Sequence, residues 1–163
     1  MINGPTLYDL AYAAGLIDGE GYIGITELTP VTRCRGNGTR VRKSPQHRIY
    51  VTVNMTERAA IEWMHQTFGG HFQPLKQRNP RHKAVFRWSV TSEAAAIFCE
   101  ILAPHLKVKA RQARLAARFY RERLAGNFQG NGGVPADELA LRRNMLAEIK
   151  ALNKRGTDLA IAA

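Results

Sequence analysis

The sequence predicts an α+β fold in which helices alternate with pairs of strands, in the order helix–strand–strand–helix–strand–strand–helix (αββαββα), followed by further helices. The first observation is a helical pattern over residues 6–21 that opens with a capping box. The second is the alternation of polar and apolar side chains over residues 48–54, typical of a half-buried strand. The third is a turn dipeptide, Asn79-Pro80, between two strand-like segments.

The first helix is expected to begin after Thr6, whose hydroxyl can accept a hydrogen bond from the Asp9 N–H while the Asp9 carboxylate reaches back. Its apolar residues recur at helical spacing and are Leu7, Leu10, Ala14 and Ile17. A neighbouring face carries almost no side chain; this bare stripe consists of Ala11, Gly15 and Gly19. Glycine inside a helix costs up to about 1 kcal/mol relative to alanine, and it is tolerated where another backbone approaches closely. We therefore expect the bare stripe to press against a partner, with the acidic Glu20 at the tip of the helix.

The next elements follow from alternation and from glycine and proline signals. Residues 21–27 and 48–54 are expected to be strands, the second with Ile49, Val51 and Val53 on its buried face. The Gly-, Arg- and Thr-rich residues 30–45 between them are expected to form a long, mobile hairpin loop. A second helix is expected over 56–68, capped by Thr56 and ended by Gly69-Gly70. Its expected buried residues are Ile61, Met64 and Phe68.

A second hairpin and three more helices complete the prediction. The hairpin strands are expected over 71–78 and 84–90. A helix is then expected to start at Thr91 or Ser92 and to break at Pro104, and another to span 107–124. We predict one domain over 1–163, made of a core (1–124), a Gly/Asn-rich connector (125–136) and a C-terminal helix (137–154). The expected inward residues of that last helix are Leu139, Met145, Leu146, Ile149 and Leu152.

The charge of the chain is strongly positive and unevenly distributed. There are 24 Lys and Arg against 13 Asp and Glu, a formal net charge of +11. Residues 33–48 contain six basic residues and no acid, residues 71–92 contain five and no acid, and residues 107–123 contain seven with Glu122 as the one acid. Long blocks of one sign suit a polyanionic partner. General solubility and adhesion to acidic membranes are alternatives that rank lower, because the strand-like blocks have no separate apolar face of the kind that enters a membrane surface.

Several classes of protein are excluded. The two cysteines, Cys34 and Cys99, are too few for a disulfide framework or a zinc site and fit a reducing compartment, with Cys99 in the core. No secretory signal precedes the first helix, and no apolar run approaches the roughly 20 residues that span a bilayer. We expect an intracellular protein of the cytoplasm, nucleoid or organelle matrix, with no membrane partner.

The nine residues 13–21 read AAGLIDGEG and resemble the signature of the LAGLIDADG homing endonucleases. Residues 14–18 match the signature in order, and Gly21 closes it. Ala13 stands in place of the first Leu, Gly19 in place of Ala, and Glu20 in place of the second Asp. Such a match is a hypothesis that its structural context must support. The predicted order of helices and strands agrees with the layout that the resemblance implies.

The resemblance implies a saddle of four antiparallel strands, with one face under the helices and the other along the DNA major groove. A two-stranded ribbon fits that groove, about 12 Å wide, where Arg and Lys can bind guanine O6 and N7. The expected DNA-binding residues are Arg35, Arg40, Arg42, Arg48, Tyr50, Thr52, Lys76, Arg78, Arg87 and Lys107.

Because the chain holds one copy of the signature, the resemblance implies a homodimer on a near-palindromic site. The expected interface residues are Ala11, Gly15, Asp18 and Gly19. Metal binding is assigned to Glu20 and Gly19, and the expected ion is Mg²⁺ or another hard cation such as Mn²⁺. The residues assigned catalytic roles are Glu20, Lys109 (with Lys107 as second choice), Asn54 and Arg58.

The predicted function is that of a sequence-specific, metal-dependent homing endonuclease, encoded within an intron or intein, that breaks both strands of a long double-stranded DNA site. One alternative is a non-cutting relative of the same fold, either an intron RNA maturase or a DNA-binding regulator. Another is a generic basic RNA- or ribosome-binding protein. The presence of Glu20 favours cleavage, and intron RNA ranks below DNA as a partner.

Overall fold

A computed structural model of the chain describes residues 4–28, 33–35, 38–40, 44–77, 79, 81–123 and 133–154, with only the backbone described at 33–35 and 38–40. It confirms the α+β class and the alternation of helices with strand pairs. The predicted core, connector and C-terminal parts of a single domain stay a prediction, because most of the connector lies outside the described residues.

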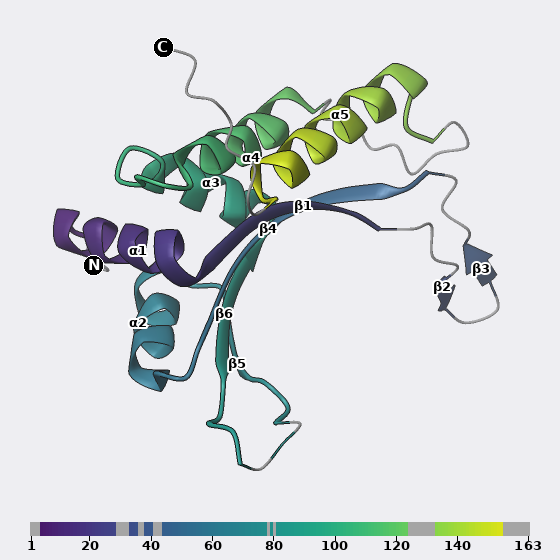
Figure 1. The fold of residues 1–163 in the computed structure, drawn as a ribbon. Coiled ribbons are helices and arrows are strands. Elements are labelled where there is room, and N and C mark those ends of the chain that lie inside the picture. Colours follow the sequence, from purple (N-terminus) through teal and green to yellow (C-terminus); the bar gives the residue numbers. More distant parts are fainter. Residues whose placement is uncertain are drawn as a thin grey trace.

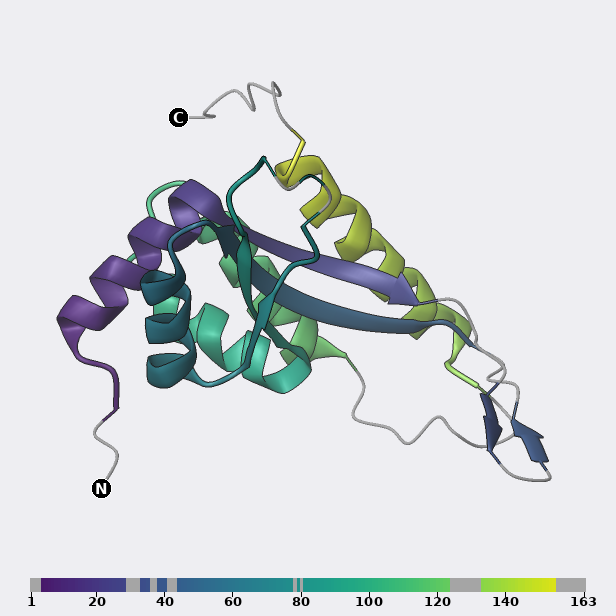
Figure 2. The same cartoon turned by 90° about the horizontal axis from the view of Figure 1, so that it is seen from below.

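Four antiparallel strands form the main sheet, in the order β1-β4-β6-β5. Their bounds are β1 Gly21–Leu28, β4 Gln46–Met55, β5 His71–Pro74 and β6 Phe86–Thr91. The sheet is curved, helices α3 (Ser92–Leu102), α4 (Ala110–Glu122) and α5 (Ala136–Leu152) lie over one of its faces, and the other face is open (Figure 1). Helices α1 (Leu7–Glu20) and α2 (Arg58–Phe68) lie next to each other at one end (Figure 2).

The predicted first helix is confirmed together with its cap. The Asp9 N–H donates to Thr6 Oγ1 at 3.2 Å, and the Thr6 N–H donates to Asp9 Oδ2 at 2.8 Å. The buried residues of α1 are Ala13, Ala14 and Ile17. Leu7 differs from the expected apolar face, because its first-turn position leaves it exposed.

The core lies between the sheet and the helices, as the alternation in β4 predicts. Ile49, Val51 and Val53 are at most 1% exposed, and the cross-strand neighbour of Val53 in β6 is the fully buried Trp88. The Trp88 indole N–H donates to the Gly69 carbonyl at 2.8 Å, so its polar atom is satisfied inside the core. Cys99 is buried on α3, as predicted.

Three local predictions are wrong. Helix α2 is capped by Glu57, whose carboxylate accepts from the Ala59 N–H, and not by Thr56. Helix α4 begins at Ala110 and not at the expected residue 107. The backbone N–H groups of residues 107–109 donate instead to the Asp18 carboxylate of α1. Strand β5 ends at Pro74 instead of continuing to 78; it is an edge strand, where a residue without an N–H is tolerated.

The loop regions differ from the prediction in detail. Within the expected loop 30–45, β2 (Arg33–Arg35) and β3 (Gly38–Arg40) pair as a small antiparallel ribbon. The turn at Asn79 is confirmed, because the Asn79 side-chain oxygen accepts from the Arg81 N–H at 3.0 Å. None of the helices in the described part is both long and apolar enough for a membrane span.

Helix α5 buries charge as well as apolar side chains. Met145, Leu146 and Ile149 are buried as predicted, whereas Leu139 and Leu152 are half-buried. Glu138 and Arg142, one turn apart, are buried and form an ion pair. Other polar contacts join α5 to the sheet: Arg143 binds Glu27 at 3.0 Å, Glu27 lies 2.9 Å from the buried His47, and the Asn153 amide donates to the Ile23 carbonyl at 2.8 Å.

Candidate functional site

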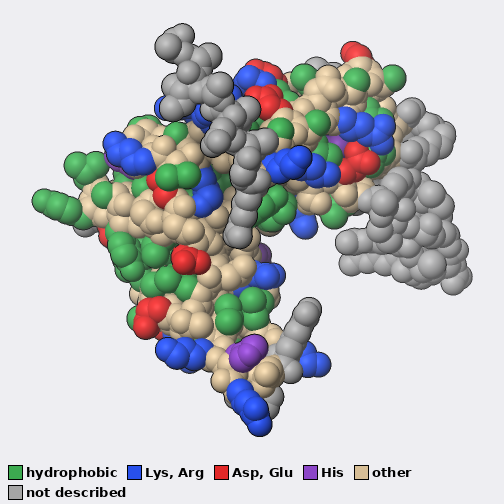
Figure 3. Space-filling model, viewed as in Figure 1, with side chains coloured by type: hydrophobic (Ala, Val, Ile, Leu, Met, Phe, Trp, Pro, Cys, Tyr) green, Lys and Arg blue, Asp and Glu red, His purple; other side chains and the backbone are tan. Residues whose placement is uncertain are grey.

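The open face of the sheet carries the polar side chains that alternate with the core residues. Arg48, Tyr50, Thr52 and Asn54 share this face of β4 because residues two apart in a strand point the same way. The antiparallel register sets Thr26 of β1 opposite Arg48, and Arg87 of β6 opposite Asn54. The molecule is hollowed on the side of the sheet away from the helical layer, and Lys and Arg side chains lie around the hollow (Figure 3).

Several groups on this polar face are already fixed by one another. Arg87 donates from Nε to the Asn54 side-chain oxygen at 2.8 Å, and the Thr52 hydroxyl donates to the Trp88 carbonyl at 3.0 Å. The rings of Tyr22 and Tyr50 stack with centroids 5.5 Å apart. Burial, followed by the Tyr22 hydroxyl, raises the pKa of Tyr50 to about 12. The surface is therefore preorganised, with a stacked aromatic pair close to where α1 joins β1.

Helix α1 ends at Glu20, and its last turn is fixed tightly to the start of β1. The Gly21 N–H donates to the Ile17 carbonyl. A Cβ at Gly21 would lie 2.6 Å from the Ile17 Cα, so only glycine fits this close approach. Glu20 is exposed. Because Gly21 pairs with Val53, the next residue of β4, Asn54, lies beside the tip that carries Glu20.

Asp18 binds the segment that leads into α4. Its carboxylate accepts from the backbone N–H groups of Lys107 at 2.7 Å, Val108 at 3.1 Å and Lys109 at 2.9 Å. Burial opposes ionisation, but these three hydrogen bonds and the Lys109 charge outweigh it and hold the Asp18 pKa below its usual value. An ionised side chain of α1 therefore caps the beginning of α4.

The side chain of Lys109 returns to α1. Its ammonium donates to the Ile17 carbonyl at 2.8 Å and to the Asp18 carbonyl at 2.6 Å. Burial lowers the pKa of Lys109, while the negative charges of Asp18 and Glu20 act in the opposite direction. The structure thus brings Lys109, the first choice from the sequence, to the helix end that carries Glu20. Lys107 shares only its backbone N–H with this cluster.

The bare stripe of α1 is open in the single chain. Ala11, Gly15 and Gly19 are exposed, and a Cβ at Gly15 or Gly19 would meet nothing within 4 Å. Large hydrophobic side chains accompany it: Leu7 is 67% exposed, Tyr8 87% and Tyr12 50%. The stripe is therefore an uncovered apolar surface, and nothing within the described chain explains its glycines.

Solved structures resemble this arrangement, although no protein-family model and no curated protein matches the sequence. The homing endonuclease I-CvuI, solved with target DNA, is 19% identical, with 93% of this chain and 85% of that chain covered and a TM-score of 0.66. The archaeal intron-encoded homing endonuclease I-Vdi141I, complexed with DNA, is 16% identical, with 91% and 86% covered and a TM-score of 0.64. The LAGLIDADG homing endonuclease I-SmaMI, bound to cleaved DNA, is 11% identical, with 90% and 45% covered and a TM-score of 0.57.

The chain has the LAGLIDADG homing endonuclease fold. The motif that the sequence suggested, residues 13–21, is the end of α1 and the first residue of β1. Lys109 is bound to this helix end, which carries Glu20, and the strand register places Asn54 beside it; the catalytic roles of the three residues stay predictions. Asp18, by contrast, uses its carboxylate within the chain; its place in a dimer interface stays a prediction.

The remaining predicted site residues of this LAGLIDADG fold lie elsewhere or beyond the described side chains. Arg58 turns away to pair with Glu62 at 2.7 Å and lies over the rings of Phe72 and Phe86, so no described contact links it to Glu20. Lys76 is exposed just beyond β5. Arg35 and Arg40 are placed on the β2–β3 ribbon by their backbone alone, and Arg42 and Arg78 lie outside the described residues.

The oxygen donors at the tip of α1 suit a hard cation. Within the described residues no group of three or more His, Cys, Asp or Glu is placed to hold a metal ion. The tip nevertheless offers the exposed Glu20 carboxylate and the carbonyl of Gly19, because carbonyls in the last helical turn lack partners within the helix. Mg²⁺ is usually held by one or two carboxylates, with water and substrate phosphates completing its shell. This donor set fits Mg²⁺, with Glu20 and Gly19 as the residues that would hold it.

Proposed function

We propose that the chain is a sequence-specific, divalent-metal-dependent homing endonuclease that acts as a homodimer and breaks both strands of a long, near-palindromic DNA site. The observation that carries this proposal is the exposed carboxylate of Glu20 at the end of α1, with the Lys109 ammonium anchored on the same helix end. Structures of the same fold support it: I-CvuI was solved with DNA in the presence of Ca and, with the DNA not cleaved, of Mg, and I-SmaMI was solved with cleaved DNA. A DNA substrate also favours a compartment that holds DNA, inside the cell.

The bare stripe supports the homodimer. Packing of α1 against the α1 of a second copy would cover the exposed stripe and its neighbouring Leu7, Tyr8 and Tyr12. Each protomer alone offers one Glu20, and a two-fold axis beside the stripe would bring the two carboxylates together. A two-fold symmetric protein is then expected to bind a DNA site whose halves are related by the same symmetry.

The open face of the sheet would hold the DNA. Arg48 is exposed on β4, and Arg87 is oriented by Asn54, so one guanidinium is free to adapt and the other is held in place. Arg side chains of this kind bind guanine edges or phosphates in the major groove. The β2–β3 ribbon, with Arg35 and Arg40, would extend the surface further along the duplex.

At the scissile phosphates the chain's own groups have separate roles. A bound divalent cation would polarise the phosphate and stabilise the leaving oxygen. Glu20 and the Gly19 carbonyl would hold that cation on the α1 tip. Lys109 would supply a fixed positive charge toward the attacking water or the phosphate, and its anchoring carbonyls keep it oriented before the substrate arrives. Asn54 would orient Arg87 beside the tip.

The experiment is cleavage of a supercoiled plasmid that carries the joined flanks of the host intron or intein, with and without Mg²⁺. Wild type should linearise the plasmid, and Glu20→Gln should not, while its specific DNA affinity stays within a few-fold, or about 1 kcal/mol. Glu20→Asp should remain active because it keeps the charge. Linearisation by Glu20→Gln at the wild-type rate would place the metal elsewhere and refute the proposal. Tight DNA binding without cleavage by wild type would instead indicate the non-cutting regulator.

A further inference from the structure

The third basic block of the sequence, residues 107–123, does not lie on the open face of the sheet. Most of it forms α4, which belongs to the helical layer on the opposite side (Figure 1). The proposed DNA contacts of the saddle therefore leave the charges of this helix unexplained.

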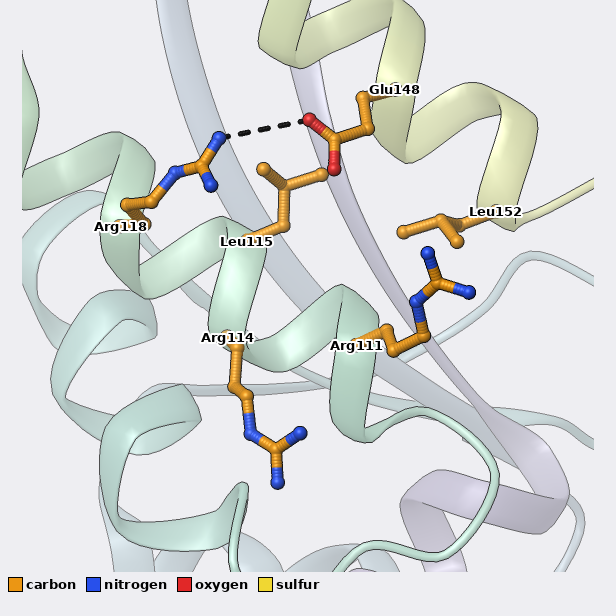
Figure 4. Close-up of a pocket in the computed structure, with 6 residues that line it drawn as sticks. All are labelled: Arg111, Arg114, Leu115, Arg118, Glu148 and Leu152. Atoms are coloured by element: carbon orange, nitrogen blue, oxygen red, sulfur yellow. Dashed lines mark ion pairs between the residues drawn. The ribbon is translucent and has the colours of Figure 1, made fainter. Parts of the chain in front are cut away.

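Three of these charges form a stripe along the outer side of α4. Arg111, Arg114 and Arg118 are all exposed, while Leu115 and the other inward residues of the helix are buried. Figure 4 shows Arg118 directed toward α5 and Arg111 lying near Leu152 at the end of α5. Together with Leu115, Glu148 and Leu152, the three arginines line a shallow hollow of about 170 Å³ between the two helices. We call Arg111, Arg114 and Arg118 the arginine stripe.

The nearby acids pair with one of the three residues of the arginine stripe. Arg118 has loose ion pairs with Glu122 at 3.5 Å and Glu148 at 3.7 Å. Arg111 and Arg114 have no carboxylate partner among the residues that the structure describes. Arg111 and Arg114, one turn apart on α4, are therefore exposed without an acidic partner among the described residues, and their side chains point in different directions (Figure 4).

The stability of the helix does not explain this placement. Arg111 is in the first turn of α4, and Arg114 follows one turn later; the first turn holds no acid. The N-terminal end of a helix carries partial positive charge, so cations there are unfavourable and anions are favoured. Asp18 already caps this end of the helix and Arg114 lies beyond the first turn, so the helix dipole neither requires nor strongly opposes the two arginines. Their exposure without an acidic partner leaves them available to a bound anion.

The geometry suits the backbone of a nucleic-acid duplex. At 1.5 Å rise per residue, the stripe from Arg111 to Arg118 is about 10.5 Å long, which corresponds to roughly three base-pair steps of duplex at 3.4 Å each. Each guanidinium presents a planar fork that binds a phosphate through two hydrogen bonds. No aromatic side chain lines the hollow, so unpaired bases have no ring to stack on, and a duplex is favoured over a single strand.

We propose that the arginine stripe is a second DNA-binding surface, which holds the phosphate backbone of another duplex segment while the saddle holds the first. The stripe lies on the opposite side of the molecule from the saddle, so the two duplexes do not compete for space. Its contacts are to phosphates only, so it binds without regard to sequence. Its function is to join two DNA segments and so to let the protein pass from one to the other.

The test is a bridging measurement between two short duplexes of unrelated random sequence, one with a fluorescence donor and one with an acceptor, in a chelator without Mg²⁺. Wild type should give energy transfer that depends on protein. Arg111→Gln/Arg114→Gln should lose the transfer but still bind a single duplex by anisotropy, with the salt dependence of wild type, because the saddle holds that duplex and its phosphate contacts are unchanged. Lys150→Gln removes a charge from α5 outside the stripe and should bridge as wild type does.

The outcomes separate this proposal from the proposed function. Bridging that survives in the double variant, or that wild type never shows, would overturn the second surface whether or not the protein cleaves its target. Transfer that requires a labelled RNA duplex in place of the second DNA would also overturn it, in favour of an RNA surface. Loss of single-duplex binding in Arg48→Ala/Arg87→Ala would bear on the saddle alone. Arg111→Lys/Arg114→Lys keeps the charge and should retain partial bridging, which excludes misfolding as the cause of the loss.

Discussion

Asp18 and Lys109 are, at the scale of single residues, the pair that assembles the site. Asp18 accepts three backbone N–H groups from the start of α4, and Lys109 returns two hydrogen bonds to the end of α1. The two residues are 91 positions apart. These reciprocal hydrogen bonds fix the position of a partly buried amine relative to the exposed carboxylate of Glu20.

Asp18→Asn should weaken this clamp. The single oxygen of the asparagine amide can accept only some of the three N–H hydrogen bonds that the carboxylate accepts. Hydrogen bonds to a charged group contribute about 1.5–3 kcal/mol. We expect the free energy of unfolding to fall by about 1–3 kcal/mol at neutral pH. Chemical denaturation measures it, with Asp137→Asn, an exposed acid of α5, as a control that should change little.

The same substitution has a pH signature with a definite sign. Because the folded pKa of Asp18 lies below its usual 3.8, the unfolded chain takes up the proton first as the pH falls. The stabilisation is therefore complete above about pH 4–5 and is lost as the pH falls through the folded pKa. The difference in unfolding free energy between wild type and Asp18→Asn should shrink in acid. A difference that stays constant down to about pH 2–3 would show that the carboxylate charge is not responsible.

Lys109→Met should slow cleavage without removing DNA binding. Methionine keeps most of the length of the side chain but loses the ammonium that donates to the Ile17 and Asp18 carbonyls. Loss of one fixed electrostatic group at a reacting centre typically costs about 10²–10³ in rate. Single-turnover cleavage measures it, with Lys107→Met as the control, since the Lys107 side chain makes no described contact with the cluster. Equal losses for the two variants would contradict a specific role for Lys109.

At the scale of elements, α1 joins two surfaces with opposite requirements. One side, with Ala13, Ala14 and Ile17, packs into the core of the chain. The other side, with Gly15 and Gly19, has open space in front of it. The packing of the described chain therefore does not require these glycines, and the proposed dimer would use the space in front of them.

Gly15→Leu should separate folding from assembly. Nothing lies within 4 Å of a Cβ at this position, so the single chain accommodates the larger residue. In a close-packed dimer the same side chain would overpack the interface, at a cost of about 1–3 kcal/mol or more. We expect sedimentation to show a monomer with unchanged helical circular dichroism. The control Ala147→Leu adds the same side chain at an exposed position of α5 and should leave the dimer intact; a dimeric Gly15→Leu would exclude the bare stripe as the interface.

Most elements were predictable because they depend on neighbours in sequence. The Thr6–Asp9 capping box, the alternation over 48–54 and the Gly69-Gly70 stop are local signals, and the structure confirms all three. The placement of Glu20 at a helix end followed from the same kind of signal. The approach of Lys109 came from the family resemblance, not from local pattern.

The features that were missed depend on distant partners. The role of Asp18 is set by a segment 89 to 91 positions away, and that contact also delays the start of α4. Glu138 and Arg142, one turn apart, have the spacing of a solvated surface pair, yet the fold buries them. Thr56 and Glu57 are adjacent acceptors that could each cap α2, and sequence spacing does not decide between them; the structure has Glu57 as the cap.

At the scale of the whole molecule, positive charge is divided between two faces. The open face of the sheet carries Arg48 and Arg87, and the helical layer carries the arginine stripe. The acids Glu27, Glu100 and Glu148 are engaged with arginines of the helical layer. The net charge of the chain is +11. Apart from Glu20 at the tip of α1, no acid lies among the described polar residues of the open sheet face.

DNA affinity should fall steeply with salt, and unequally for different variants. Each neutralised phosphate contributes about −0.9 to the slope of log affinity against log salt. Arg48→Ala and Arg87→Ala should weaken specific binding more than non-specific binding, by about 1–3 kcal/mol each if they contact base edges. Anisotropy titrations over a salt series measure both. An affinity that barely changes with salt would rule out binding through the sheet face.

Strand β4 lies inside the sheet, with β1 on one side and β6 on the other. A shift of one residue in its register would turn Val51 and Val53 out and Tyr50 and Thr52 in, so core packing strongly specifies the register. The outward side chains contribute little to that constraint. Substitutions at these alternate positions can therefore accumulate in a lineage, or in a selected library, without unfolding the protein. Under the proposed function, the preferred target sequence is then free to diverge faster than the scaffold that presents it.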